Sequence, residues 1–93
     1  MTEDEEIRRG FEAQRILGEP LIKEAFEAIE SAIHSSMKRV DVGARDAQRD
    51  LIVTLQLLDK LRAHIQTHIT TGKLADIAKQ ERLADKVRRR IGL

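Results

Sequence analysis

The longest uninterrupted helical pattern in the sequence runs from Ala44 to Thr71. This stretch contains no proline or glycine, and its apolar residues recur at steps of three and four, the period of one face of an α-helix. Ile52, Val53 and Leu57 widen the apolar arc, so one short partner helix cannot cover it. We therefore predict that this helix, roughly 40 Å long, is the centre of a small bundle or an oligomer. The residues expected at the oligomer interface are Leu51, Ile52, Leu55, Leu58, Ile65 and Ile69.

A second helical pattern precedes it, from about Pro20 to Val40, and a first helix is expected from about Glu3 to Leu17. Thr2 should accept a hydrogen bond from the backbone amide of Glu5, as in a capping box. The apolar stripe of the second helix is Ile22, Phe26, Ile29, Ile33, Met37 and Val40.

Three short segments are expected to separate the helices. Gly18 suits the left-handed position after the first helix, and Pro20 suits the first turn of the next. Residues 41–43 form a turn of the length found between antiparallel helices, with Asp41 as a helix cap. Gly72 is expected to end the central helix. The predicted register sets Ile33 and Met37 near Leu51, and Phe26 and Ile29 near Leu58.

These elements predict an all-α fold in which an antiparallel helical hairpin carries short flanking helices. One domain is expected over residues 1–93, made of an N-terminal helix (1–18), the hairpin (20–71) and a basic C-terminal helix (73–93). A single hairpin of this size is close to the margin of stability. Two hairpins packed as a four-helix bundle would cover the apolar arc, so we expect a homo-oligomer.

Charge is distributed unevenly although the net charge is only +1. Residues 1–30 carry nine acids and four bases, and residues 31–93 carry thirteen bases and seven acids. These charges suit solvated helix faces of opposite sign, and they also leave open a basic C-terminal helix that binds nucleic acid or another polyanion. The candidate polyanion contacts are Lys79, Arg82, Lys86, Arg88, Arg89 and Arg90.

No residue pattern predicts catalysis. His64 and His68 are four apart on one helical face, as two zinc ligands would be, but a third ligand is missing and surface or interface histidines are the expected reading. The Gly72-Lys73 pair lacks the upstream glycine and the strand of a phosphate-binding loop. We expect no enzyme activity, no metal site and no cofactor.

The sequence has neither an export signal nor an apolar run long enough to cross a membrane, and it has no cysteine, so we expect a soluble cytoplasmic protein.

Three segments carry a resemblance to a known group of proteins: residues 13–33, residues 49–69 and residues 71–76, with the motifs LGEP (17–20) and TGKLA (71–75). Together they resemble small helical proteins encoded among the virion structure genes of tailed bacteriophages and prophages. The resemblance implies a virion assembly or head-associated accessory protein in the host cytoplasm or the virion, with capsid or other virion proteins as partners. It carries over no catalytic residue. The alternative hypothesis is a nucleic-acid-binding or regulatory protein that uses the basic C-terminal helix.

Overall fold

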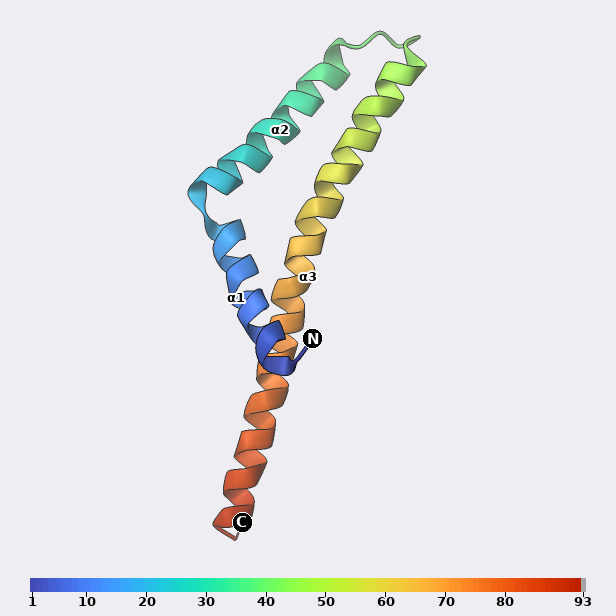
Figure 1. Ribbon diagram of the computed structural model, residues 1–93. Helices are drawn as coiled ribbons and strands as arrows, with labels where there is room; N and C mark the ends of the chain where they lie inside the picture. Colours follow the sequence, from blue (N-terminus) through green and yellow to red (C-terminus); the bar gives the residue numbers. More distant parts are fainter. Residues whose placement is uncertain (93) are drawn as a thin grey trace. The chain divides into compact units, whose positions relative to one another are not determined.

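The computed structural model describes residues 1–92, and this part of the chain consists of three helices without a strand. Helix α1 spans Glu3–Gly18, α2 spans Pro20–Arg39 and α3 spans Arg45–Arg90 (Figure 1). The prediction of an all-α chain is therefore confirmed. The elements group into two compact units, one formed by residues 1–15 and 66–92 and the other by residues 16–65. We call them the crossing unit and the hairpin unit.

The boundaries of α1 and α2 follow the local sequence. The backbone amide of Glu5 donates to the Thr2 hydroxyl oxygen at 3.2 Å, as the capping pattern predicts. Pro20 opens α2. Gly18 differs from its prediction because it is the last residue of α1 and is not left-handed; among the described glycines only Gly92 has a positive φ. A single residue, Glu19, in extended conformation suffices to separate the two helices.

Gly72 does not end the central helix, and this is the main correction to the predicted elements. Helix α3 is 46 residues long and runs through Gly72 to Arg90, so no separate helix begins at residue 73. Glycine in a helix interior costs about 1 kcal/mol relative to alanine because its backbone is freer in the unfolded chain. Here Gly72 is buried against the backbone of α1, and the close packing offsets that cost.

The turn between α2 and α3 is held by a residue that the sequence pattern did not single out. The Gln48 side-chain amide donates to the backbone oxygens of Asp41 and Val42, each at 2.8 Å. The predicted cap by the Asp41 side chain is not the contact that forms. Because Gln48 lies in the first turn of α3, its side chain ties the start of that helix to the turn.

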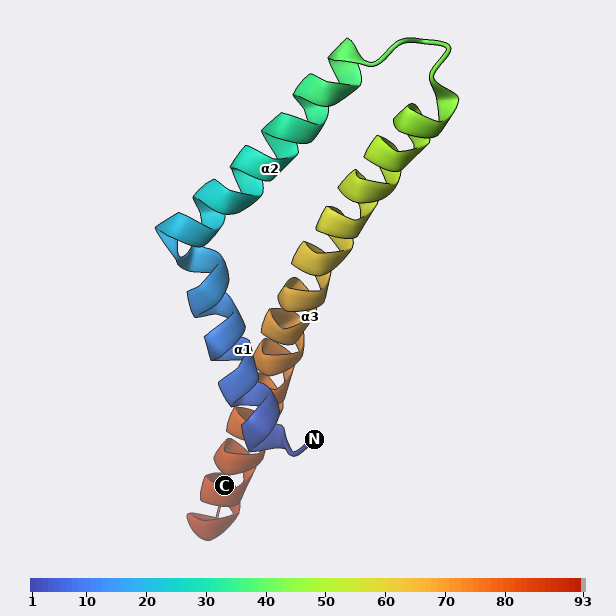
Figure 2. The same ribbon diagram turned by 45° about the horizontal axis from the view of Figure 1, so that its top comes forward.

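In the hairpin unit, α2 and the first part of α3 lie side by side and run in opposite directions (Figure 2). Ile33 and Leu58 are its buried residues, at 6% and 8% exposure. The Arg62 guanidinium lies 5.0 Å from the centre of the Phe26 ring. The predicted register placed Phe26 near Leu58, and Phe26 contacts Arg62, one helical turn further along α3.

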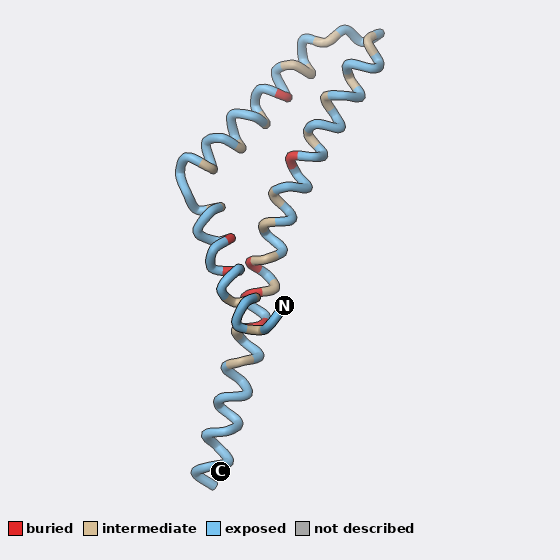
Figure 3. The backbone as a smooth tube through the Cα atoms, in the orientation of Figure 1, coloured by how far each residue is buried: buried red, intermediate tan, exposed pale blue. Residues whose placement is uncertain are grey.

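In the crossing unit, α1 packs against the second half of α3. The buried residues are small or aliphatic: Gly10 and Ala13 on α1, and Ile69, Gly72 and Ala75 on α3. Figure 3 shows how few positions of either unit are buried. No helix within the described residues is long and apolar enough to cross a membrane.

Candidate interaction surfaces

The crossing unit brings two helix backbones into direct contact. A Cβ added to Gly72 would lie 2.8 Å from the Cα of Gly10 and 2.9 Å from the carbonyl oxygen of Glu6. A Cβ added to Gly10 would lie 2.9 Å from the Cα of Gly72 and 3.0 Å from the carbonyl oxygen of His68. Only glycine fits at either position without a shift of the backbone. The two glycines thus set the position at which α1 crosses α3.

Ion pairs lie beyond the glycine contact, where the acidic start of α1 meets the basic part of α3. The ammonium of Lys79 donates to the Asp4 carboxylate at 2.8 Å. The Arg82 guanidinium donates to both oxygens of the Glu3 carboxylate, with one of the two bonds at 2.9 Å. Two of the six candidate polyanion contacts are therefore already paired within the chain.

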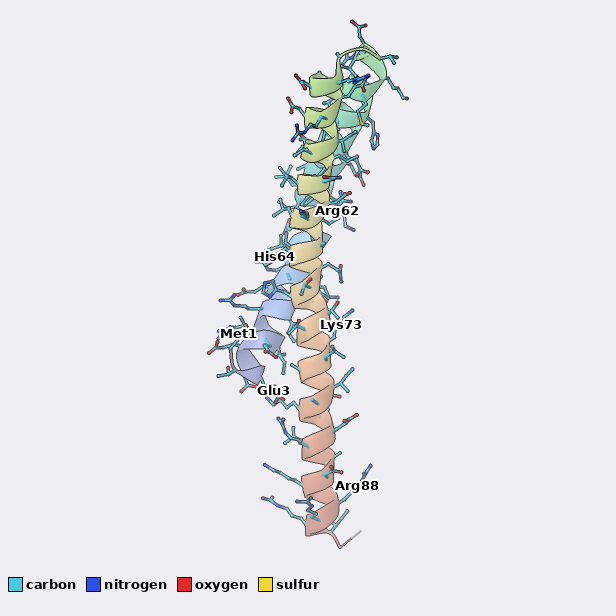
Figure 4. All side chains as sticks on the ribbon, turned by 90° about the vertical axis from the view of Figure 1, so that its right-hand side faces the viewer. Met1, Glu3, Arg62, His64, Lys73 and Arg88 are labelled. Atoms are coloured by element: carbon cyan, nitrogen blue, oxygen red, sulfur yellow. The ribbon has the colours of Figure 1, made fainter. Side chains whose placement is uncertain are left out.

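The remaining four basic residues have a different environment. Lys86, Arg88, Arg89 and Arg90 belong to the last turns of α3, where every residue is exposed. Arg88 lies 3.5 Å from the Asp85 carboxylate, an exposed pair within the same helix that contributes little to stability. Figure 4 shows the side chains around Arg88 extending away from α3 on several sides.

The bond from Lys79 to Asp4 predicts a measurable pKa change. The hydrogen bond and the positive charge of Lys79 hold the pKa of Asp4 below the usual 3.8, and the same bond raises the pKa of Lys79. Since a carboxyl group with a lowered pKa stabilises the fold above its unfolded pKa, this contribution is complete above about pH 5. It is lost as the pH falls through the lowered pKa, below 3.8.

We expect carbon NMR of the Asp4 carboxyl group to titrate below pH 3.8 in the wild-type chain. In Lys79→Gln the midpoint should rise towards the ordinary value of an aspartate, because a shorter, neutral side chain replaces the charged ammonium donor. Lys60→Gln, which changes a lysine of the hairpin unit, is the matched control and should leave the Asp4 titration unchanged. Equal midpoints in the Lys79 variant and the wild type would contradict the ion pair.

The histidines do not converge on a metal site. No group of three histidine, cysteine, aspartate or glutamate side chains that could hold a metal ion is found in residues 1–92. His34 lies 3.9 Å from the Glu30 carboxylate, and both are on α2. His64 is exposed and His68 is half-buried. The arrangement gives no reason to assign a metal to any of the three.

The hairpin unit carries a further ion pair that links its helices. Arg62 lies 3.3 Å from the Glu30 carboxylate, and both side chains are partly exposed. The sequence pattern gives no partner for Arg62. Its guanidinium lies over the Phe26 ring and also donates a hydrogen bond to the Glu30 carboxylate. These two contacts explain why an arginine fits in this seam.

The six predicted interface residues fall into three environments. Leu58 and Ile69 are buried within the chain, and Ile52 is 45% exposed. Leu51, Leu55 and Ile65 are half-buried. These residues line both units, so the side chains of the predicted interface are largely used inside the chain, and their role between chains stays a prediction.

Other large apolar side chains remain uncovered. In the hairpin unit, Leu21 is 72% exposed, Leu57 60% and Leu61 53%. In the crossing unit the same holds for Phe11 and for Leu74, Ile77, Leu83, Val87 and Ile91 of α3. Single exposed apolar residues are common in monomers, but several close together indicate an interaction surface.

The spacing of small residues is the signal in the sequence that could have found the helix crossing. Gly10 and Ala13 are three apart on α1, and Gly72 and Ala75 are three apart on α3, so each pair lies on one helical face. Treating Gly72 as a helix end concealed the second pair.

Comparison with known proteins supplies no further assignment. No protein family, no curated protein and no solved structure was found to match this chain.

Proposed function

We propose that this chain is a non-catalytic helical interaction protein that acts by oligomerisation and docking. One observation carries the proposal: in both units, large apolar side chains lie in solvent while very few residues are buried. Among the described residues, Phe11, Leu21, Leu57 and Leu74 are each at least 60% exposed. Association with other molecules would remove part of this apolar surface from water.

The biological setting of the proposal comes from the resemblance to small phage and prophage proteins. In that setting, the oligomer would dock on capsid or other virion proteins during assembly, or remain associated with the head. A helical bundle built from two hairpin units is the architecture that we propose for the oligomer, because each hairpin has only one seam of its own.

Thermal unfolding at different protein concentrations tests the proposal. If folding is coupled to association, mass action raises the melting temperature as the chain concentration increases. Unfolding can be monitored by circular dichroism at 222 nm. We expect the melting temperature to be higher at a chain concentration of several hundred micromolar than at a few micromolar. A melting temperature independent of concentration, with full helicity throughout, would contradict the proposal.

A second candidate function is polyanion binding by the last part of α3. At 100° per residue, Lys79, Arg82, Lys86, Arg89 and Arg90 lie on one side of that helix. One observation favours this function. Lys79 and Arg82 already bind carboxylates of the same chain, those of Asp4 and Glu3, as they would bind an anionic ligand. Replacing these acids by their amides should then strengthen salt-dependent binding to duplex DNA; unchanged or absent binding would exclude the idea.

A further inference from the structure

We propose that one face of the hairpin unit binds a second copy of this chain. The face, which we call the outer face, is formed by Leu21, Ile29 and Ala32 of α2 and by Val53, Leu57 and Leu61 of α3. This inference rests on the proposed function, since it names the partner and the surface through which the chain would associate. Its six residues differ from those of the interface expected from the sequence, which stays a separate prediction.

The position of the face on α2 follows from helical geometry and one ion pair. Ile33 is buried, so it marks the side of α2 that faces α3. At 100° per residue, Glu30 lies about 60° from Ile33 in one direction, and Ile29 lies about 40° away in the other. Ala32 is about 100° from Ile33 in that same second direction. Ile29 and Ala32 therefore lie on the side opposite to Glu30, and Ile29 is 48% exposed there.

The corresponding positions on α3 are found in the same way. Leu58 is buried and marks the side that faces α2. Arg62 lies about 40° from Leu58 in one direction around the helix. In the other direction, Leu61 lies about 60° from Leu58 and Leu57 lies about 100° from Leu58. Both leucines are more than half exposed, and Val53, further round on their side, is 43% exposed.

The ion pair decides whether these two sides belong to one surface. In antiparallel helices that face each other, residues displaced in the same rotational direction lie on the same side of the pair. Glu30 and Arg62 are displaced in the same direction, and their side chains meet at 3.3 Å. Since Ile29 and Leu61 are both displaced in the opposite direction, they share the opposite side of the hairpin unit.

The register brings the same residues to one level. Arg62 contacts both Phe26 and Glu30, so it lies level with the turn between them. Because the two helices are antiparallel, each residue further along α2 is level with a residue one earlier on α3. Counting from that contact, Ile29 is level with about Leu61, and Ala32 is level with about Leu57. Ile29 and Ala32 of α2 and Leu57 and Leu61 of α3 thus form one continuous patch, with Leu21 and Val53 at its two ends. Arg39 and Asp50 lie on the same side beyond Val53.

A second copy is the occupant that fits this face, because a twofold axis sets the same surface against itself. Its six positions carry no charge, and the charged residues next to it on the same side, Arg39 and Asp50, have opposite signs. From Leu21 to the level of Val53 the face is about 22 Å long and two helices wide, so it covers roughly 450 Å² per chain, the size of a weak contact that dissociates on dilution.

Leu57→Asp tests the inference, with Leu74→Asp as its matched control. Both substitutions put the same charge at exposed leucines of α3, 60% and 64% exposed, but only Leu57 belongs to the outer face. In a twofold dimer each substitution acts twice, so we expect the dissociation constant of Leu57→Asp to rise roughly a hundredfold or more. Sedimentation velocity should give a helical monomer for Leu57→Asp and a dimer for Leu74→Asp.

A second measurement remains informative if the aspartate variant does not fold. The chain has no cysteine, so Leu57→Cys and Leu74→Cys each introduce a single thiol. Under mild oxidation, Leu57→Cys should form disulfide-linked dimers at least tenfold faster than Leu74→Cys. Equal rates, or a Leu57→Asp dimer as tight as the wild type, would overturn the outer face but leave oligomerisation standing. A wild-type chain that is monomeric at every concentration would overturn the proposed function itself.

Discussion

Replacement of Gly72 by alanine is expected to destabilise the crossing unit by up to about 2 kcal/mol, because forcing an extra carbon into a packed site costs about 1–3 kcal/mol. The new Cβ would lie 2.8 Å from the Cα of Gly10 and 2.9 Å from the Glu6 carbonyl oxygen, and neither backbone atom can rotate away. The steric cost opposes a gain in helix propensity of about 1 kcal/mol. Amide hydrogen exchange should therefore accelerate along α1, and the melting temperature should fall.

Gly18→Ala is the matched control for this substitution. Gly18 is also helical, has a negative φ, and has no atom within 4 Å of an added Cβ. The same change should be neutral or stabilising there by up to about 1 kcal/mol, because alanine restricts the unfolded chain. A Gly72→Ala chain as stable as Gly18→Ala, with unchanged exchange along α1, would contradict the direct contact of the two backbones.

Truncation of Leu58 to alanine should have the largest effect in the hairpin unit. Leu58 is 8% exposed, and its side chain, with that of Ile33, makes up the buried part of the seam. Removing it costs the lost burial and leaves a partial cavity, together about 2–4 kcal/mol. Denaturant unfolding followed by circular dichroism measures the loss of free energy.

Val42→Ala serves as the control for the loss of apolar atoms. Val42 lies in the turn and is 91% exposed, so its truncation should change the free energy of unfolding by less than about 0.5 kcal/mol. A small effect of Leu58→Ala, comparable to that of Val42→Ala, would mean that the seam between α2 and α3 contributes little to stability.

The sequence was most informative where one local interaction decides the structure. The Thr2 cap, the start of α2 at Pro20 and the helical run from Arg45 onwards depend on hydrogen bonds and apolar periodicity within a few residues. These features can be predicted from the sequence without knowing which helices pack against each other. The all-α class follows from them.

The errors arose where a contact distant in the sequence overrides local preference. Gly72 reads locally as a helix end, yet the packing of Gly10 against it makes glycine the residue that fits inside α3. The seam between α2 and α3 includes Arg62 because Phe26 and Glu30, more than thirty residues earlier, both contact it. Each requires knowledge of the register between helices, which periodicity alone does not provide.

The same limit applies to the candidate sites. A sequence shows that Lys79 and Arg82 are basic, but only the crossing of α1 and α3 shows that Asp4 and Glu3 pair with them. Likewise, the leucines of the central helix form one broad arc in the sequence. The structure divides that arc into Leu58, which is covered, and Leu57, which is exposed.

The mass of the wild-type chain in solution tests the central claim most directly. Sedimentation equilibrium, monitored by interference optics because the chain has no tryptophan or tyrosine, gives that mass at each concentration. We expect a mass of two 10.6 kDa chains at high concentration, falling towards one on dilution. A single 10.6 kDa species at every concentration up to the millimolar range would contradict the claim that the exposed apolar surface is covered by association.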